Sequence, residues 1–527
     1  MKIINSLEKK DFIGIIVSII LVYIARFYYK YLTRPNPLPG PVPLPIVGNL
    51  LSIFFYAKGD MTQWLKSLQE KHGDIFETYI GSFRRIVLAR ADYIEKLMSP
   101  STKSNYVLRT EHMPAFDELN ISGKGFFFNR DIPTWRFNRQ ILSQVVLTPS
   151  FSKEALHRNQ IIFNELNEYW KEIGQDVPID FSKWIHKFIT ESIFQLAIGL
   201  KVGTLAKYFN DSVELSKRKY IEPNPIDENI INFDQMIEAR LRNSQFVFNV
   251  PAFIRRTIFK KRNDEIHKNR NESRKIMMKI IDLRRKEIED DKELGSDMLT
   301  LLITANTEQI DEQHSKPLTN DQIFQILIEA IIGGIETTTN LLCFIVFHIA
   351  HYPNVLARLR EELDTIYGSE KNHQISMEDL SKMRYTDSII KECARLINPS
   401  KLFQRNSSLP DTMIGREWPA NTAFFAYIEG IHHNPIHWKD PLKFNPDRFM
   451  EPEPQKNTFL TFGGGVRICP GRKLALVTMK CLISLIYRNL DISLVDMDAP
   501  LKLRKDLVNS CTELKIRVKQ REAHVNV

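Results

Sequence analysis

The chain has few cysteines for its length. Its 527 residues include only five, and no regular spacing relates them: Cys343, Cys393, Cys469, Cys481 and Cys511. Secreted proteins that depend on disulfides usually carry even, clustered sets of cysteines, so this odd and scattered set is not a disulfide framework. A reducing compartment is therefore favoured, and most of these cysteines are expected to be small buried hydrophobic residues.

Strong charge of one sign is also missing. The sequence has 72 Lys and Arg against 63 Asp and Glu, a net charge of +9, with no long block of like charge and no zinc-type spacing of cysteine and histidine. An excess this small and diffuse argues against a nucleic-acid partner. It is compatible with a basic patch that meets an acidic protein or an anionic membrane surface.

Nucleotide-binding motifs are absent too, although the chain contains three consecutive glycines, Gly463, Gly464 and Gly465. A phosphate loop would require G-x-x-x-x-G-K-[ST], and no glycine of the chain begins that pattern. A dinucleotide fingerprint would require a glycine where Ile468 stands. The run FLTFGGGVRICPGRK therefore needs another explanation, because glycine destabilises regular structure unless the backbone must approach something closely.

A long apolar segment stands near the beginning of the chain. Residues 12–32, FIGIIVSIILVYIARFYYKYL, are apolar or aromatic apart from Ser18, Arg26 and Lys30. About 20 residues of helix cross a hydrocarbon core, and cations near the end of such a helix can reach the interface. We expect residues 1–33 to be a membrane anchor. A cleavable signal peptide is the alternative, but no small-residue cleavage site follows, and the flanking charges do not fix the orientation.

The sequence after the apolar segment divides into a hinge and one domain. Residues 34–50 contain six prolines, so we expect a stiff, extended hinge rather than a helix. Beyond it the chain reads as mostly helical with a few strands, and it shows neither an internal repeat nor a second domain boundary. Residues 51–527 are therefore predicted to form a single large, mainly α domain with small β-sheets.

Individual elements can be placed within this domain. The stretches IFETYIG (75–81) and RRIVLA (84–89) alternate as strands do, with a hairpin turn between them. Thr319 and Gln322 form a capping box at the start of the longest predicted helix, about residues 320–351. This helix is too apolar for the surface, and its internal acids argue against a second membrane span, so it belongs in the core.

The centre of this long helix is the run GGIETTT, residues 333–339, which is composed of poor helix formers. Such a run is expected to open a local groove and to present Glu336 and Thr337 inside an apolar site. Threonine hydroxyls there can also bond back to the carbonyl four residues earlier. Strain in the middle of the longest helix indicates function. A packing notch for a crossing element is the other interpretation.

The glycine run leads into Cys469 at a predicted loop-to-helix junction, because a helical apolar pattern follows Pro470. A thiolate at such a position is stabilised by the helix dipole and by backbone N–H groups. The glycines are expected to let the loop lie flat against a large planar object, with Phe462 as an aromatic surface beside it. A buried thiolate against a plate is what a cysteine-ligated haem requires.

These residues resemble the cytochrome P450 monooxygenases. Phe462-Gly463-x-Gly465-x-Arg467-x-Cys469-x-Gly471 is similar to the complete haem-binding signature of that family. Further matches follow the order of the family's motifs over nearly the entire chain, and they are Trp135-x-x-x-Arg139, Gly333-Gly334-Ile335-Glu336-Thr337-Thr338, Glu392-x-x-Arg395 and FNPDRF at residues 444–449. The E-x-x-R match is short enough to occur by accident, whereas the long signature is rarely matched by chance.

The resemblance implies a role for each matched residue. Cys469 would be the axial iron ligand of haem b (heme b), and the cofactor-binding set would be Trp135, Arg139, Arg405, Phe462, Arg467, Cys469 and Gly471. Trp135 and Arg139 share one helix face and would donate two N–H groups to a haem propionate. Arg467 would be a second cation for the propionates. Arg405 would be a third, with an ordinary surface arginine as the alternative.

Two further sets of residues follow from the same resemblance. Glu336 and Thr337 would be the catalytic pair of the oxygen-activation motif. Glu392, Arg395 and Arg448 would form a buried charge cluster with a structural role. The sequence also departs from the family pattern, because Asn398-Pro399-Ser400 replaces a common Pro-Pro, which puts the shape of the pocket in question. Glu336 stands where sterol demethylases often have histidine, which argues against that activity.

The implied reaction is haem-thiolate monooxygenation of a lipophilic substrate. The chain has no flavin or nicotinamide fingerprint, so electrons are expected from a separate NADPH-dependent cytochrome reductase. Resemblance to the membrane-bound branch of the family implies that the protein is bound to a lipid bilayer, with its catalytic domain on the cytosolic face of the endoplasmic reticulum. Residues 101–128 and 324–335 are expected to line the pocket. A haem-thiolate isomerase or dehydratase that acts on peroxides is the first alternative, and a non-enzymatic haem or lipid binding protein is the second.

Overall fold

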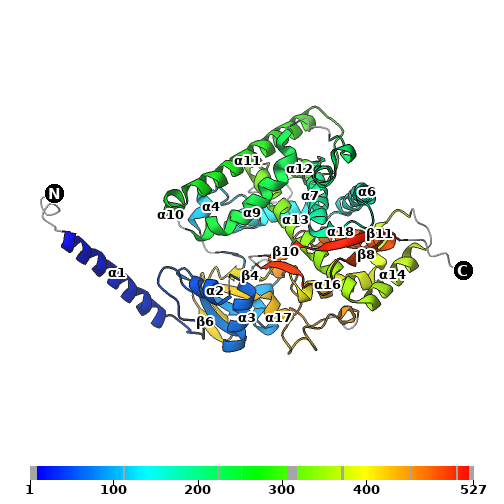
Figure 1. The fold of residues 1–527 in the computed structure, drawn as a ribbon. Coiled ribbons are helices and arrows are strands. Elements are labelled where there is room, and N and C mark those ends of the chain that lie inside the picture. Colours follow the sequence, from blue (N-terminus) through cyan, green and yellow to red (C-terminus); the bar gives the residue numbers. More distant parts are fainter. Residues whose placement is uncertain are drawn as a thin grey trace.

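The first helix, α1 (Lys9–Leu32), extends away from the rest of the molecule (Figure 1). The computed structural model describes residues 9–521 apart from 58, 102, 111–112, 222–225, 227, 251, 306–316, 369–372, 451–453 and 506–507. Within α1, residues Phe12–Leu32 are long and apolar enough to cross a membrane, with a mean hydropathy of 2.1. The outer ends of the predicted anchor and of the predicted large domain lie outside the described residues, and the boundaries at residues 33 and 50 stay a prediction.

Residues 34–49 contain no helix, as their prolines indicate, and they are bound to the sheet that follows. The guanidinium of Arg34 donates to the carboxylate of Glu77 at 2.6 Å. A Cβ on Gly40 would lie 2.1 Å from the Glu77 carbonyl oxygen, so only glycine allows this approach. The proline-rich segment is therefore packed against the main body rather than free.

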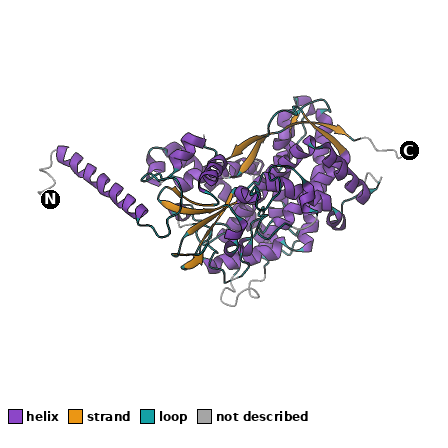
Figure 2. Ribbon diagram, turned by 90° about the horizontal axis from the view of Figure 1, so that it is seen from below, coloured by secondary structure: helices purple, strands orange, loops and turns teal. Residues whose placement is uncertain are grey.

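Helices make up most of the chain, and strands occur in a few small groups (Figure 2). After α1 the helices are, in chain order, α2 (Leu50–Ala57), α3 (Met61–His72), α4 (Pro114–Glu118), α5 (Ile132–Val146), α6 (Pro149–Ile173), α7 (Phe181–Ile198), α8 (Thr204–Ser212), α9 (Phe233–Asn249), α10 (Ala252–Thr257), α11 (Lys260–Glu289), α12 (Met298–Ile303), α13 (Asn320–His351), α14 (Pro353–Tyr367), α15 (Met377–Lys382), α16 (Arg384–Leu396), α17 (Ile428–His432) and α18 (Arg472–Asn489). The predicted mainly α class is confirmed.

The largest described sheet has four strands in the order β1 (Ile75–Ile80), β2 (Phe83–Leu88), β7 (Ala423–Tyr427) and β4 (Leu402–Asn406). β1 and β2 form the predicted antiparallel hairpin, and β2 pairs in parallel with β7. The smaller sheets are β3 (Ile179–Asp180) with β11 (Lys515–Gln520) and β8 (Leu490–Leu494), β9 (Lys502–Lys505) with β10 (Asn509–Glu513), and β5 (Asp411–Met413) with β6 (Arg416–Trp418).

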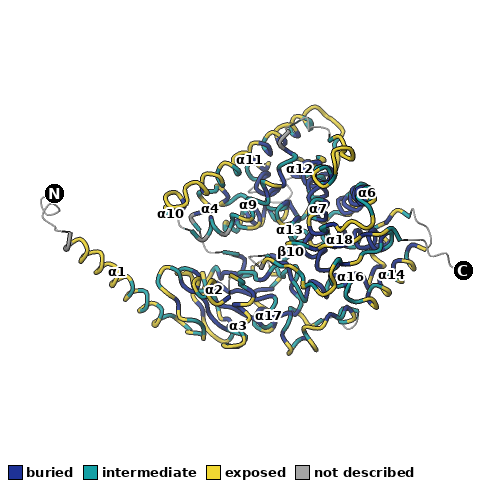
Figure 3. Tube along the Cα trace, viewed as in Figure 1, coloured by how far each residue is buried: buried dark blue, intermediate teal, exposed yellow. Residues whose placement is uncertain are grey.

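The long helix α13 runs through the core and packs against α7, α16 and α18. Its capping box is formed as predicted, because Thr319 and Gln322 each accept from the other's backbone N–H. The helix meets the length and composition of a membrane span, but 61% of its most apolar window is buried inside the protein. α1 is exposed along most of its length, in contrast to α13 (Figure 3). The predicted core position of α13 is confirmed.

Candidate functional site

A cavity of about 1740 Å³ lies beside the middle of α13. Its other walls come from the loop before α5, from α9 and α11, from residues 398–405, and from the loop that leads into α18. Both segments that the sequence predicted for the pocket contribute to it in part, including Phe126 and Phe128 from the first loop and Ile328 to Gly334 from α13. Segments far apart in the sequence therefore meet around one space.

Cys469 faces this cavity three residues before α18 begins at Arg472, at the predicted loop-to-helix junction. Its backbone N–H donates to the carbonyl of Phe462 at 2.9 Å, which closes the loop between them. Burial raises the pKa of the Cys469 thiol. The backbone N–H groups of Gly471 and Arg472 and the guanidinium of Arg109 act in the opposite direction, since each favours the thiolate. A bound metal cation would deprotonate such a thiol outright.

The three glycines before Cys469 serve different purposes. Gly463 lines the cavity with φ +67°, and a Cβ there would meet open space. A Cβ on Gly464 would lie 2.8 Å from the Met98 sulfur, and one on Gly465 would lie 2.6 Å from the Ser99 carbonyl oxygen. For the last two glycines, the close approach indicated by the sequence is thus an approach to residues 98–99. Only Gly463 stands where it could face a planar group.

Arginine side chains gather around the Cys469 loop. Arg467 is 2% exposed, and its guanidinium lies over the Trp135 ring at 3.8 Å while it donates to the carbonyls of Val107 and Phe126. Burial, followed by the nearby positive charges of Arg109 and other arginines, lowers the pKa of Arg467 to about 7. Such a depression indicates a cation that lacks an anionic partner.

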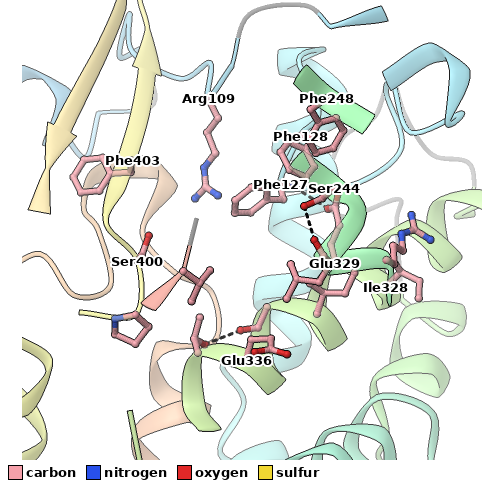
Figure 4. A pocket seen from close by; sticks show the side chains of 18 of the residues that line it. Arg109, Phe127, Phe128, Ser244, Phe248, Ile328, Glu329, Glu336, Ser400 and Phe403 are labelled. Carbon is pink, nitrogen blue, oxygen red and sulfur yellow. Dashed lines mark hydrogen bonds between the residues drawn. The ribbon is translucent and has the colours of Figure 1, made fainter. Parts of the chain in front are cut away.

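Arg405 and Arg109 add two more cations at the cavity wall. Arg405 is 2% exposed, so the alternative of an ordinary surface arginine is wrong. Burial, and after it the charge of Arg109, lowers the pKa of Arg405. The sequence predicted Arg109 only as part of the pocket-lining segment 101–128 and not as a cation of the haem site, because it is a lone arginine in a loop with no motif around it. In Figure 4 its side chain extends between Phe403 and Phe127.

Trp135 and Arg139, both on α5, contact the same loop from outside the cavity lining. Arg139 donates to the carbonyl of Ile468 at 2.5 Å, next to Cys469. The indole Nε1 of Trp135 and the Nε of Arg109 are buried without a partner among the described residues. None of the ion pairs in the described part of the chain involves the four arginines 109, 139, 405 and 467.

These residues fit a haem group. Buried charges and buried donors without a partner destabilise a fold, so the positive charges of the arginine cluster, the Nε of Arg109 and the Nε1 of Trp135 favour an anionic partner. The two propionates of haem b are such anions, and the Cys469 sulfur beside them is a soft ligand for iron. Phe462 and Gly471 both line the cavity next to the cysteine, as a flat ligand would require.

The two glycines in the centre of α13 agree with both interpretations of the sequence, a groove at a functional site and a packing notch. Gly333 lines the cavity, and a Cβ there would meet nothing within 4 Å. A Cβ on Gly334 would lie 3.0 Å from Ile193 of α7, so this glycine is also the packing notch for a crossing helix. The hydroxyl of Thr337 bonds back to the Gly333 carbonyl at 2.8 Å and lines the cavity. The helix continues unbroken through this run.

Glu336 lines the main cavity, and its carboxylate also meets α7. Its Oε1 lies 3.5 Å from Nε2 of His186, which the sequence gave little reason to single out. Burial raises the pKa of Glu336, but the hydrogen bond and charge of His186, together with Arg504 and Asn340, outweigh burial, so the pKa is lowered overall. A space of about 10 Å³ on the α7 side is lined by His186, Glu336 and Asp234. Titratable groups thus continue beyond the cavity wall.

A second acid of α13, Glu329, binds the loop that covers the cavity. Its carboxylate accepts from the backbone N–H groups of Phe126 and Phe127 at 2.7 and 2.8 Å. A Cβ on Gly125 would lie 2.3 Å from the same carboxylate, so the loop wraps it closely. Burial raises the pKa of Glu329, against these hydrogen bonds. In Figure 4, Glu329 lies among the aromatic residues of the loop and α9.

The predicted buried charge cluster is confirmed. Arg395 donates to both oxygens of Glu392, at 2.7 and 2.9 Å, and neither side chain is exposed. Arg448 adds a contact of 3.3 Å to the same carboxylate. The cluster belongs to α16 and the segment after α17 and is not part of the cavity lining, which agrees with its expected structural role.

Comparisons with known proteins agree with this geometry. The family model described as Cytochrome P450 matches residues 38–519. Cytochrome P450 3A2 of Rattus norvegicus is 23% identical over 538 residues, covering 100% of both chains. The isoflavone 3'-hydroxylase of Medicago truncatula is 27% identical over 488 residues, 90% of each chain. In fold, the heme domain of cytochrome P450DA gives a TM-score of 0.75 at 18% identity, with 93% of this chain and 99% of that chain covered.

Proposed function

Because the chain belongs to the cytochrome P450 family, we propose that it is a membrane-anchored monooxygenase that inserts one oxygen atom of O2 into a lipophilic substrate. The net reaction is RH + O2 + 2 e⁻ + 2 H⁺ giving ROH + H2O. The observation that carries the proposal is the position of Cys469 on the wall of a large cavity, ringed by buried arginines that have no carboxylate partner among the described residues. A relative named as a hydroxylase supports the same reaction class.

The cofactor would be haem b, with its iron held by the Cys469 thiolate. Haem with a thiolate ligand supplies cleavage of the O–O bond and oxygen transfer. Arg109, Arg405 and Arg467 would bind and neutralise the propionates from the cavity side, and Arg139 with Trp135 supports the loop from α5. The propionates would offset the mutual repulsion of these cations.

Two residues of α13 control protons in this site. The Thr337 hydroxyl, which bonds to the Gly333 carbonyl, holds a water at the cavity surface in a fixed position. Glu336 takes up protons from the α7 side, where His186 is in contact with its carboxylate, and delivers them toward Thr337. Both residues therefore act on proton delivery rather than on haem binding.

The acid–threonine pair favours a monooxygenase over a peroxide isomerase or dehydratase. A rearrangement of a peroxide consumes neither O2 nor electrons, and it does not need protons delivered from outside. The contact of Glu336 with His186, and the further titratable groups beyond it, support a route for protons into the cavity. A non-enzymatic haem carrier would not need this route either.

The bilayer is the site of action, at the cytosolic face of the endoplasmic reticulum. Large apolar side chains of α2 and of the segment around α10 are exposed, namely Phe54, Phe55, Tyr56, Phe253 and Ile258. Phe54 and Ile258 also line the cavity. Exposed apolar groups at a cavity entrance, in a chain with the α1 anchor, support entry of a lipophilic substrate from the membrane.

Electrons come from a separate NADPH-dependent flavoprotein reductase. The experiment that tests the proposal measures the reduced carbon monoxide spectrum of the purified protein, and then product formation from a lipid library with reductase, NADPH and O2. Each component is omitted in turn. Turnover of a peroxide substrate without NADPH and O2 would support the isomerase instead, and a protein without the thiolate-type spectrum would refute both.

A further inference from the structure

The cavity wall formed by α9 and α11 is strongly cationic. It contributes four cations and one acid to the lining, and these are Arg240, Lys261, Arg262, Arg270 and Glu265. Uncharged donors stand among them, including Asn243 and Ser244 of α9. The haem propionates do not account for this wall, because none of their proposed partners, Arg109, Arg405 and Arg467, belongs to α9 or α11. A cationic wall in an otherwise apolar cavity indicates an anionic group on the ligand.

Arg240 is the residue of this wall that most clearly needs a binding partner. Its Nη1 is buried and has no hydrogen-bond partner, and the guanidinium forms no ion pair within 4 Å among the residues that the structure describes. Burial, and after it the charge of Arg270, lowers the pKa of Arg240 to about 10, while the charge of Glu329 opposes that change. A buried donor without an acceptor destabilises the protein until an acceptor arrives.

The acids near Arg240 and Arg270 are already engaged. Glu329 accepts from backbone N–H groups of the covering loop and from Gln325. Asp321 and Glu118, which face Arg270, are bound by Arg274, Lys124, Arg255 and His267. The Nε of Arg270 is itself buried without a partner. Two neighbouring guanidinium groups on the cavity wall thus keep unused donors.

We propose that the substrate is a lipophilic carboxylic acid whose carboxylate binds at Arg240, with Arg270 beside it, and whose apolar body extends along α13 toward Thr337. This inference rests on the proposed function. A planar guanidinium matches a carboxylate in a bidentate geometry, which distinguishes an acid from an alcohol or an ester. Lys261 and Arg262, which are exposed and line the cavity, would attract the acid electrostatically.

The same geometry sets the length of the acid. Glu329, the acid that acts on Arg240, precedes Thr337 by eight residues on α13, which corresponds to about 12 Å of helix. The cavity follows α13 through this interval. Because Arg240 and Thr337 line the same cavity, we expect a long acid, with its carboxylate at Arg240 and its apolar body along α13.

The test measures binding to the purified holoenzyme by calorimetry, with dodecanoic acid, methyl dodecanoate, dodecanol, dodecyl phosphate and hexanoic acid as probes. We expect dodecanoic acid to bind about tenfold or more tightly than its methyl ester, in line with a charge-assisted hydrogen bond. Arg240→Gln should remove that preference while ester affinity changes little, and Arg240→Lys should keep part of it. Arg262→Gln, an exposed arginine of the same wall, is the matched control and should keep the preference.

Each other outcome overturns the proposal. Equal affinity of the wild-type protein for acid and ester would exclude a carboxylate site. Tighter binding of dodecyl phosphate than of dodecanoic acid would show that the preferred anion is not a carboxylate. Tighter binding of hexanoic acid would refute the expected length of the substrate. An equal loss of acid and ester affinity in Arg240→Gln would show that Arg240 has a structural role and does not bind the carboxylate. Loss of the acid preference in Arg262→Gln would show that the anion binds near Arg262 instead. If Arg240→Gln does not bind haem, the proposal is judged from the acid and ester affinities of Arg240→Lys and of the wild-type protein. Because binding is measured without turnover, failure of the NADPH-dependent reaction would refute the proposed function separately.

Discussion

Removal of Arg395 should destabilise the protein severely. The Arg395 guanidinium donates to both carboxylate oxygens of Glu392 and to the His432 carbonyl, and the pair is completely buried. Among the described residues, the partners that the Glu392 carboxylate keeps in Arg395→Ala are the Asn445 N–H at 2.9 Å and the Arg448 guanidinium at 3.3 Å. Its strongest, bidentate partner would be gone while the charge remains in the interior.

The expected loss is about 3–5 kcal/mol, since breaking a buried pair strands an uncompensated charge. Most domains have a total stability of about 5–15 kcal/mol, so the variant should retain little folded holoprotein at physiological temperature. Replacing both members should be milder. In Glu392→Leu with Arg395→Met the completely buried pair is removed together, and Arg448 keeps its backbone carbonyl partners, so the double variant should be more stable than Arg395→Ala alone.

The assay is urea unfolding of anchor-truncated protein, monitored by haem absorbance and far-ultraviolet circular dichroism. Arg358→Ala is the matched control, because Arg358 pairs with Asp447 at 2.8 Å on the surface, with side chains 45% and 51% exposed. That pair should contribute about 0–1 kcal/mol. The reasoning is refuted if Arg395→Ala unfolds within about 1 kcal/mol of the control, or if the double variant is the least stable of the set.

Four further outcomes can be checked. Cys469→Ala should lose the thiolate-type spectrum of the reduced carbon monoxide complex, and a retained spectrum would contradict its assignment. Thr337→Ala should keep that spectrum and oxidise NADPH with less product and more hydrogen peroxide, with Thr337→Ser closer to wild type; a wild-type ratio of product to NADPH would remove Thr337 from the mechanism. A protein that starts at Arg34 should fold and bind haem with much weaker membrane association, whereas haem-free aggregate would contradict a separate anchor. His186→Gln should raise the pKa of Glu336, because His186 lowers it, so the acidic limb of the pH profile for product per NADPH should move to higher pH; an unchanged limb would exclude the contact from proton delivery.

Local patterns predicted the elements of the fold well. The capping box at Thr319, the hairpin of β1 and β2, and the start of α18 after Pro470 all rest on short-range chemistry that leaves a clear mark in sequence. The arrangement of small sheets could not be read in the same way. β2 pairs with β7, more than 330 residues later, and nothing local specifies that partner.

The site was predictable only where residues belong to a motif. Cys469, Arg467 and Thr337 stand in patterned stretches, and the structure brings all three to the cavity or its wall. Arg109 and His186 carry no such pattern, since their importance comes from what folds against them. Glu329 did leave a signal, because an acid inside a long apolar helix requires an explanation.

The loop of residues 125–129 is fixed through its own main chain. Its N–H groups are bound by Glu329, and its carbonyls at Phe126 and Asn129 are bound by Arg467. These bonds involve none of the side chains of the loop. Phe128, which packs against Phe116 and Phe248, can therefore be exchanged without releasing the backbone that supports the Cys469 loop, whereas the Phe127 ring also lies under the guanidinium of Arg109. Over evolutionary time, substitutions at Phe128 would reshape substrate choice while the chemistry is inherited unchanged.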